Sequence, residues 1–304
     1  MKRNGFFRLI ILLIISIVFS LMFVSCASGA AAAEEYFSMG MAYYELGKFQ
    51  EAEYWLLRAA SADRTRVASE YNLGRIAFET GRFYEAQEHF ENILERDPDN
   101  VIALKAAAYT RIRTGDLETA ESYYNRVLDL VPESSDDGYN HALVLYALEK
   151  YRDSEEVILR YPFALEENPD ALLLLARARG AQGKIETIGD YARWINQNDP
   201  NPKVFHEYAM ALEKAELYAL ALENLYASLE SMPANPTNIE ASQVRFDLAR
   251  ILFIADPGNA EGIAELTMAI NQGFDAGTAL GILTNDHRIG AEQKNEIINS
   301  LESN

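Results

Sequence analysis

The residues that could perform covalent or metal chemistry are few and widely spaced. The chain has one cysteine, Cys26, and four histidines, His89, His141, His206 and His287. No two histidines have the short helical spacing of a zinc site, and one cysteine excludes a site built from several thiolates. The glycines of residues 180–186, GAQGKIE, lack the spacing of a phosphate-binding loop and the Ser or Thr after its lysine. We therefore predict no enzyme activity, no cofactor and no metal.

Residues 97–100, Asp-Pro-Asp-Asn, resemble half of a calcium-binding loop. The other oxygen ligands and the closing glutamate of such a loop are absent. We interpret this segment as a turn followed by a helix cap.

The net charge restricts the partners of the chain. There are 46 acidic and 27 basic residues, which gives −19. Without the first 25 residues the charge is −22, because 24 basic residues remain against 46 acidic ones. Such a surface repels phosphate backbones, so we predict no nucleic-acid partner. A basic protein partner is compatible with the charge.

The first 25 residues have the composition of a secretory signal. Three basic residues precede an apolar run over residues 9–24. The run leads into FVSCAS, with Ser25 before and Ala27 after Cys26. This segment resembles a bacterial lipobox, with Phe23 where that motif usually has an aliphatic residue. The resemblance implies cleavage before Cys26 and attachment of lipid chains to its thiol, which would anchor the protein to a membrane.

The same resemblance implies a location. Ala27 is not the aspartate that retains many lipoproteins in the inner membrane, so we expect the outer membrane, facing the periplasm. Residues 26–32 would be a short tether. An uncleaved N-terminal anchor in the inner membrane is the alternative, because the apolar run approaches the roughly 20 residues of a membrane span. A soluble secreted form is a third possibility.

A pattern with a period of 34 residues covers most of the remaining chain. Glycines recur at Gly47, Gly81, Gly115 and Gly183, and Glu149 fills the missing place. Small residues recur at the same spacing at Ala52, Ala86, Ala120 and Ser154. Apolar residues before each glycine have a helical period, and so do those after it. Each unit therefore predicts two helices joined by a glycine turn, stacked on the next unit to bury its apolar face.

This pattern resembles the tetratricopeptide repeat family, most clearly over residues 67–100, with Leu73, Gly74, Gly81, Ala86 and Pro98. The resemblance implies an all-α, right-handed solenoid of six to seven helical hairpins. We place repeats at 33–66, 67–100, 101–134, 135–168, 169–202 and 202–235. Pro162 should shorten the second helix of the fourth repeat. A degenerate repeat and a C-terminal capping helix are expected in residues 236–304.

In this family the first helix of each repeat faces the concave side. Sixteen positions correspond to that face here, and seven of them are Phe or Tyr. The candidate partner-binding residues are Phe37, Met41, Tyr44, Tyr71, Asn72, Arg75, Phe78, Lys105, Tyr109, Tyr139, Leu143, Tyr146 and Arg177. Ile112, Leu173, His206 and Met210 complete the sixteen positions, to which Asn72 is an addition. Tyrosines interspersed with basic residues suit an extended peptide or a helix. The competing interpretation is that these side chains only pack between repeats.

The combined pattern predicts a membrane-tethered scaffold that gathers other envelope proteins. The alternative is an accessory lipoprotein that binds a small apolar ligand for a periplasmic transporter. An open groove would favour the first function, and an enclosed apolar cavity the second.

Overall fold

A computed structural model describes residues 31–63, 67–233 and 238–302 of the chain. Every regular element in these three ranges is a helix, as the all-α prediction requires. The helices divide into two compact units between Leu148 and Glu149, and each unit is described by itself. The predicted signal segment and Cys26 lie outside the described residues. In the described part of the chain, no helix has both the length and the apolar character needed to cross a membrane.

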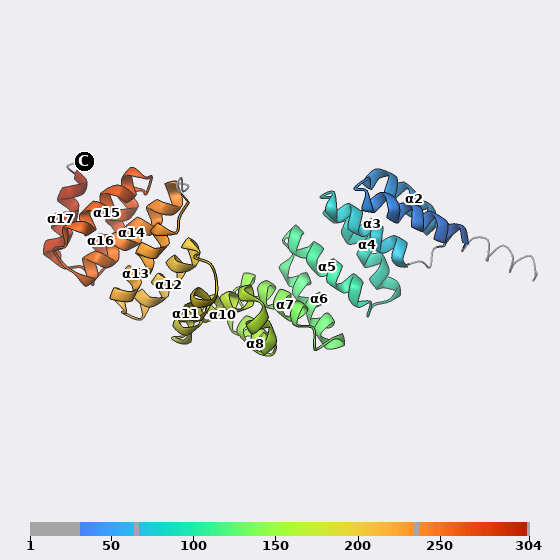
Figure 1. The fold of residues 1–304 in the computed structure, drawn as a ribbon, viewed down its shortest axis with the longest axis horizontal. Helices are drawn as coiled ribbons and strands as arrows, with labels where there is room; N and C mark the ends of the chain where they lie inside the picture. The colour runs from blue at the N-terminus through green and yellow to red at the C-terminus, as the bar shows by residue number, and fades with distance from the viewer. Residues whose placement is uncertain (1–30, 64–66, 234–237, 303–304) are drawn as a thin grey trace, which may run out of the picture. The chain divides into compact units, whose positions relative to one another are not determined.

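The first unit contains a helix over residues 31–45 and six further helices (Figure 1). These are α2 (Phe49–Ala62), α3 (Val67–Glu79), α4 (Phe83–Arg96), α5 (Val101–Thr114), α6 (Leu117–Leu130) and α7 (Ser135–Ala147). Helices that follow one another in sequence also contact one another from α2 to α7. One core cluster joins α3, α4 and α5 and reaches α6 through Val127.

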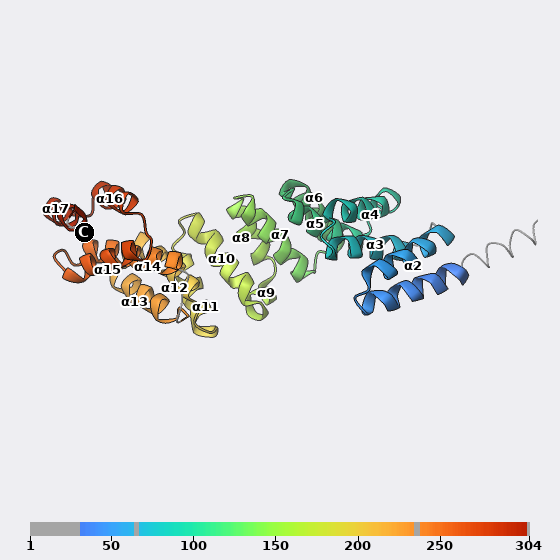
Figure 2. The same cartoon turned by 90° about the horizontal axis from the view of Figure 1, so that it is seen from above.

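The second unit begins with α8 (Tyr151–Leu159), α9 (Pro162–Glu167) and α10 (Pro169–Ala181). It continues with α11 (Glu186–Gln197), α12 (Pro202–Lys214), α13 (Tyr218–Glu230) and α14 (Asn238–Ala255). The last helices are α15 (Ala260–Asn271), α16 (Ala276–Asn285) and α17 (Ala291–Glu302). In both views α12, α13, α14 and α15 lie side by side (Figures 1 and 2). The interruption predicted at Pro162 is present, because α8 ends at Leu159 and α9 begins at the proline.

Polar side chains cap the starts of α5 and α6, and the first of these caps was predicted from the sequence. The side chain of Asn100 accepts a hydrogen bond from the backbone N–H of Ala103 at 3.1 Å, so the Asp-Pro-Asp-Asn segment caps α5. Asp116 caps α6 in the same way through the N–H of Thr119. Such a cap satisfies one of the four backbone donors that a helix start leaves unpaired.

The turns between paired helices use the left-handed backbone region. Gly81 has φ +78°, and Arg82 N–H donates to the carbonyl of Ala77 at 2.8 Å, which closes the end of α3. Glu149, which occupies a glycine position of the 34-residue pattern, has φ +59°. Glu216 has φ +60° in a later turn. The repeated backbone geometry therefore persists where the glycine itself is replaced, at a cost in strain.

Small residues allow paired helices to approach closely in the first two hairpins. A Cβ atom at Gly40 would lie 2.7 Å from Cγ of Leu56, and one at Gly74 would lie 2.6 Å from Cε1 of Phe90. Both partners are buried, with Leu56 0% and Phe90 2% exposed. Phe90 therefore occupies the space that a side chain on residue 74 would need.

An ionic network around the buried carboxylates of Glu213 and Asp247 joins α12, α14 and the segment before α17 in the second unit. Arg250 donates to Glu213 at 2.7 Å and to Asp247 at 3.1 Å. His206 Nε2 lies 2.9 Å from Asp247. Arg288 lies 3.0 Å from Glu213 and donates to Asp286 at 2.6 Å. Although burial raises the pKa of Asp247, hydrogen bonds from His206 and Gln243 lower it overall.

Candidate binding pocket

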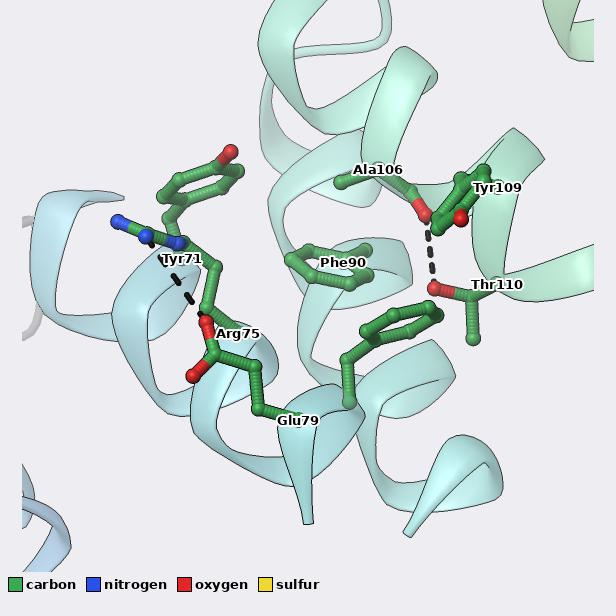
Figure 3. Close-up of a pocket in the computed structure, with 8 residues that line it drawn as sticks. Tyr71, Arg75, Glu79, Phe90, Ala106, Tyr109 and Thr110 are labelled. Atoms are coloured by element: carbon green, nitrogen blue, oxygen red, sulfur yellow. Dashed lines mark hydrogen bonds and ion pairs between the residues drawn. The ribbon is translucent and has the colours of Figure 1, made fainter. Parts of the chain in front are cut away.

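An open pocket of about 180 Å³ lies between α3 and α5 in the first unit. Its lining residues come from three helices: Tyr71, Arg75, Phe78 and Glu79 on α3, Phe90 on α4, and Ala106, Tyr109 and Thr110 on α5. Figure 3 shows Phe90 between the side of α3 that carries Tyr71 and Arg75 and the side of α5 that carries Tyr109 and Thr110. The pocket therefore spans two successive hairpins.

The floor of the pocket is apolar. Phe90 is 2% exposed, and the ring of Tyr71 lies against it with centroids 5.7 Å apart. The hydroxyl of Thr110 donates to the carbonyl of Ala106 at 2.7 Å, so this polar group of the lining already has a hydrogen-bond partner (Figure 3). An apolar group entering the pocket would not leave that hydroxyl without a hydrogen bond.

The α5 side of the pocket presents exposed aromatic surface. Tyr109 is 50% exposed, and its ring centroid lies 5.2 Å from that of Phe78. Phe78 in turn contacts Phe83 edge to face at 5.3 Å. Rings held by neighbouring rings offer contact area at little cost in side-chain entropy, because their rotamers are already restricted.

The α3 side carries one cation and one anion. Arg75 donates to the hydroxyl of Tyr44 at 2.7 Å and to the side-chain oxygen of Asn72 at 3.2 Å. Glu79 lies 4.0 Å from Arg75 and accepts a hydrogen bond from Tyr44. Burial and the bond to Glu79 both raise the pKa of Tyr44, because each favours the neutral phenol.

The pair of Arg75 and Glu79 can exchange partners. Their side chains are 39% and 38% exposed, and exposed pairs of this kind contribute at most about 1 kcal/mol. A ligand carboxylate could therefore replace Glu79 as the partner of Arg75 at little cost. Tyr44 and Asn72 would keep the guanidinium in place.

A second cation lies beside the aromatic side of the pocket. The guanidinium of Arg113 is 4.8 Å from the ring centroid of Phe83 and 5.8 Å from that of Phe78. Arg113 is exposed and makes no ion pair with any residue that the structure describes. Its charge is therefore available to an acidic group of a ligand. Arg113 is not among the residues predicted from the sequence, although it directly follows the predicted inward position Ile112.

The helical hairpins agree with sequence-based comparisons. Residues 33–66 match one model of the tetratricopeptide repeat, and residues 71–135 match another. These two segments are tetratricopeptide repeats. The pocket lies within the second of these segments, at the junction of the hairpins α3–α4 and α5–α6. No curated protein matches the sequence.

Solved tetratricopeptide structures share the fold. A tetratricopeptide repeat protein from Parabacteroides merdae aligns with a TM-score of 0.58 at 19% identity, covering 84% of this chain and 98% of its own. YrrB, described as a tetratricopeptide protein with an unusual peptide-binding site, aligns with a TM-score of 0.54 at 18% identity, covering 66% of this chain and 100% of its own. MamA from Desulfovibrio magneticus aligns with a TM-score of 0.52 at 17% identity, covering 54% of this chain and 93% of its own. The predicted all-α tetratricopeptide fold is confirmed.

Four of the predicted partner-binding residues line the pocket together: Tyr71, Arg75, Phe78 and Tyr109. Two other predicted residues contact the side chain of Arg75. Tyr44 contacts Arg75 directly, and buried Asn72 donates to the carbonyl of Ala68 at 2.8 Å while accepting from Arg75. Both therefore position the guanidinium. Glu79 and Phe90 are not among the predicted residues, because Glu79 lies at a helix end and Phe90 belongs to the second helix of its repeat.

Other candidates in the first unit lie outside this pocket. Phe37 is half-buried against the core cluster of Ala52 and Leu56, and Met41 is half-buried one turn further along the same helix. Lys105 forms an ion pair with Asp137, whose side chain is only 5% exposed. On α7, Tyr139 and Tyr146 are half-buried and Leu143 is 38% exposed. Ile112 packs in the cluster that joins α5, α6 and α7.

The remaining candidates belong to the second unit. Arg177 donates to both carboxylate oxygens of Glu207, at 2.8 and 3.1 Å, and is therefore committed to α12. Leu173 is 7% exposed, and His206 belongs to the ionic network around Asp247. His141, in the first unit, is buried and stacks on Tyr124. In the described ranges no three His, Cys, Asp or Glu side chains come together as metal ligands would.

Proposed function

We propose that this chain is a lipid-anchored scaffold of the bacterial envelope that binds other envelope proteins through its tetratricopeptide repeats. The lipobox-like FVSCAS segment supports the anchor, and the acidic composition supports a partner other than nucleic acid. The anchor would be in the outer membrane, with the repeats facing the periplasm. We propose no catalytic activity for the chain.

The observation that carries the binding proposal is the open aromatic pocket between α3 and α5. An apolar side chain of an extended peptide or of a helix would occupy the floor at Phe90. The exposed face of Tyr109 would cover it from the α5 side. Arg75 and Arg113, on either side, would bind acidic groups flanking that side chain. YrrB, which shares this fold, is described as having a peptide-binding site, and this supports the same class of ligand here.

The size of the pocket distinguishes this function from the alternative, which is the binding of a small apolar ligand for a periplasmic transporter. Ligand sites of that kind typically enclose about 300–1,000 Å³. The pocket here has about 180 Å³ and is open, with Tyr109 half exposed. These dimensions fit one side chain of a larger partner better than a whole ligand.

Site-specific photocrosslinking in native membranes tests the binding proposal. A photoreactive phenylalanine analogue at residue 109 should crosslink one defined partner, whereas the same analogue at residue 84 should not. Tyr84 is the matched control because it is also an exposed tyrosine, 80% exposed, and lies outside the pocket on α4. The crosslinked peptide would then be synthesised, and its affinity measured by calorimetry.

We expect Tyr109→Ala to lower the affinity for that peptide at least about 10-fold, a loss that marks an energetically important contact. Tyr84→Ala should change the affinity less than about 2-fold. Equal crosslinking from both positions, or equal affinity of both variants, would show that the pocket is not the binding site. A tightly bound small molecule that co-purifies with the wild type and is lost from Tyr109→Ala would support the transporter alternative.

The anchor has its own test. Wild-type protein should incorporate a labelled fatty acid and remain with the membrane fraction, whereas Cys26→Ser should do neither. If Cys26→Ser remained in the membrane without label, the uncleaved N-terminal anchor would be correct.

A further inference from the structure

Three aromatic side chains and an arginine form a cluster on the first hairpin. Tyr36 contacts Trp55 with ring centroids 5.7 Å apart, and Tyr54 meets Trp55 edge to face at 5.1 Å. The guanidinium of Arg58 lies 4.6, 5.7 and 5.3 Å from the rings of Tyr36, Tyr54 and Trp55. It also donates to the hydroxyls of Tyr54 at 3.2 Å and Tyr36 at 3.3 Å.

This cluster is exposed and its cation is not neutralised. Tyr54 is 54% exposed, and Leu57, one turn further along α2, is 49% exposed. Arg58 makes no ion pair with a described residue. Tyr and Trp combine an apolar ring with a polar group, and arginine combines an apolar stem with a charge. Side chains with these properties are favoured where hydrocarbon meets water at a bilayer surface.

The cluster also lies at the end of the hairpin where the chain enters it. The helix over residues 31–45 runs antiparallel to α2, because Tyr36 contacts Trp55 near one end and Tyr44 contacts Phe49 near the other. Tyr36 is five residues after Ala31, about 7.5 Å along a helix. Cys26 is five residues before Ala31, which spans at most about 18 Å. A lipid on Cys26 would therefore keep the cluster within about 25 Å of the bilayer.

We propose that the surface formed by Tyr36, Tyr54, Trp55, Leu57 and Arg58 docks on the headgroup region of the membrane that holds the lipid anchor. This inference rests on the proposed lipidation of Cys26. The anchor holds the surface close to the lipid, so weak intrinsic affinity is sufficient. Glu34 and Glu35 lie nearby in sequence, so the surface suits zwitterionic phospholipid better than anionic lipid. The rings enter the interface, and Arg58 meets a lipid phosphate.

The two tryptophans of the chain allow a direct test. Trp55 belongs to the surface, whereas Trp194 on α11 is 7% exposed in a core cluster of the second unit. Full-length lipidated protein is reconstituted into phosphatidylcholine–phosphatidylethanolamine vesicles, with or without bromine near the headgroup end of the acyl chains. For each variant we measure the ratio of the tryptophan emission in brominated vesicles to that in unbrominated vesicles. Bromine should remove at least half of the emission that Trp55 contributes. Trp55→Phe, which retains only Trp194, should lose almost none.

Exposed-residue variants test the surface without disturbing the core. Tyr54→Ala/Leu57→Ala should at least halve the quenching of Trp55 while the anchored fraction stays unchanged. The matched control is Tyr84→Ala/Ile102→Ala, which removes an 80% exposed tyrosine and a 61% exposed aliphatic residue elsewhere in the first unit. This control should behave as wild type.

The outcomes separate the docking surface from the anchor. If wild type is anchored but Trp55 is not quenched, docking is wrong and the anchor stands. If wild type does not remain with the vesicles, or Cys26→Ser remains with them equally, the lipid anchor is wrong and docking falls with it. If Trp55 is unquenched in vesicles but shielded from a soluble quencher in native membranes, the surface binds a protein, which also overturns docking on lipid.

Discussion

The ring of Phe90 lies against the backbone of Gly74, where an added Cβ atom would be 2.6 Å from Cε1 of the ring. This contact sets how closely α3 and α4 approach, and it places Phe90 at the floor of the candidate pocket. The geometry of the pocket therefore depends on the absence of a side chain at residue 74.

We expect Gly74→Ala to lower the free energy of unfolding. Overpacking costs about 1–3 kcal/mol, and the higher helix propensity of alanine offsets up to about 1 kcal/mol of this. Gly189→Ala is the control, because Gly189 also lies inside a helix and a Cβ there meets no atom within 4 Å. The free energy of unfolding of the control, measured by chemical denaturation, should rise by about 0.5–1 kcal/mol. Equal stabilisation by both substitutions would contradict the close contact.

The left-handed turns predict opposite effects for two further substitutions. Residue 81 has φ +78°, and a Cβ atom there would meet no neighbour within 4 Å. Gly81→Ala should therefore lower the free energy of unfolding only through backbone strain, by about 1–2 kcal/mol. Glu216→Gly relieves the same strain at φ +60°, and the entropy of the added glycine offsets part of the gain. Chemical denaturation should show a lower free energy of unfolding for Gly81→Ala and an increase between zero and about 1 kcal/mol for Glu216→Gly. A clear loss at both positions would mean that Glu216 makes contacts that outweigh its strain.

Lys105 distinguishes a binding role from a packing role. Its partner Asp137 is buried and otherwise accepts a hydrogen bond from Ser134 at 2.5 Å. We expect Lys105→Met to lower the free energy of unfolding by about 1–3 kcal/mol, because the carboxylate loses its counter-charge. Lys105→Met combined with Asp137→Asn should recover most of that loss in a double-mutant cycle. Additive losses would show that Lys105 acts independently of Asp137, which would leave it available to a partner.

The ionic network of the second unit predicts a stability that depends on pH. The hydrogen bond from Arg288 lowers the pKa of Asp286 from 3.8 to about 2. A depressed pKa contributes stability above the unfolded-state value, and this contribution is lost as the pH falls from about 4 to about 2. We expect Asp286→Asn to lower the free energy of unfolding by about 1–2 kcal/mol at pH 7. The difference between wild type and variant should shrink across that pH window. A difference independent of pH would mean that the charge of Asp286 is not its source.

The sequence by itself determined the repeating unit. The 34-residue period located the turns, and it located them even at Glu149, where the backbone keeps the left-handed conformation without glycine. It also identified Gly74 as a place of close approach. These properties follow from local constraints, namely helical periodicity, helix caps and the few backbone conformations that reverse a chain.

Only the tertiary structure decided which inward-facing residues form a site. Periodicity gives the side of a helix on which a residue lies, but not the partner that it meets on the next hairpin. Lys105 and Arg177 matched the pattern as well as Arg75 did, yet Lys105 pairs with Asp137 and Arg177 with Glu207. The floor at Phe90 and the cation of Arg113 likewise depend on distances between hairpins. Such distances arise from packing across the repeats, because each contact joins residues that no local pattern relates.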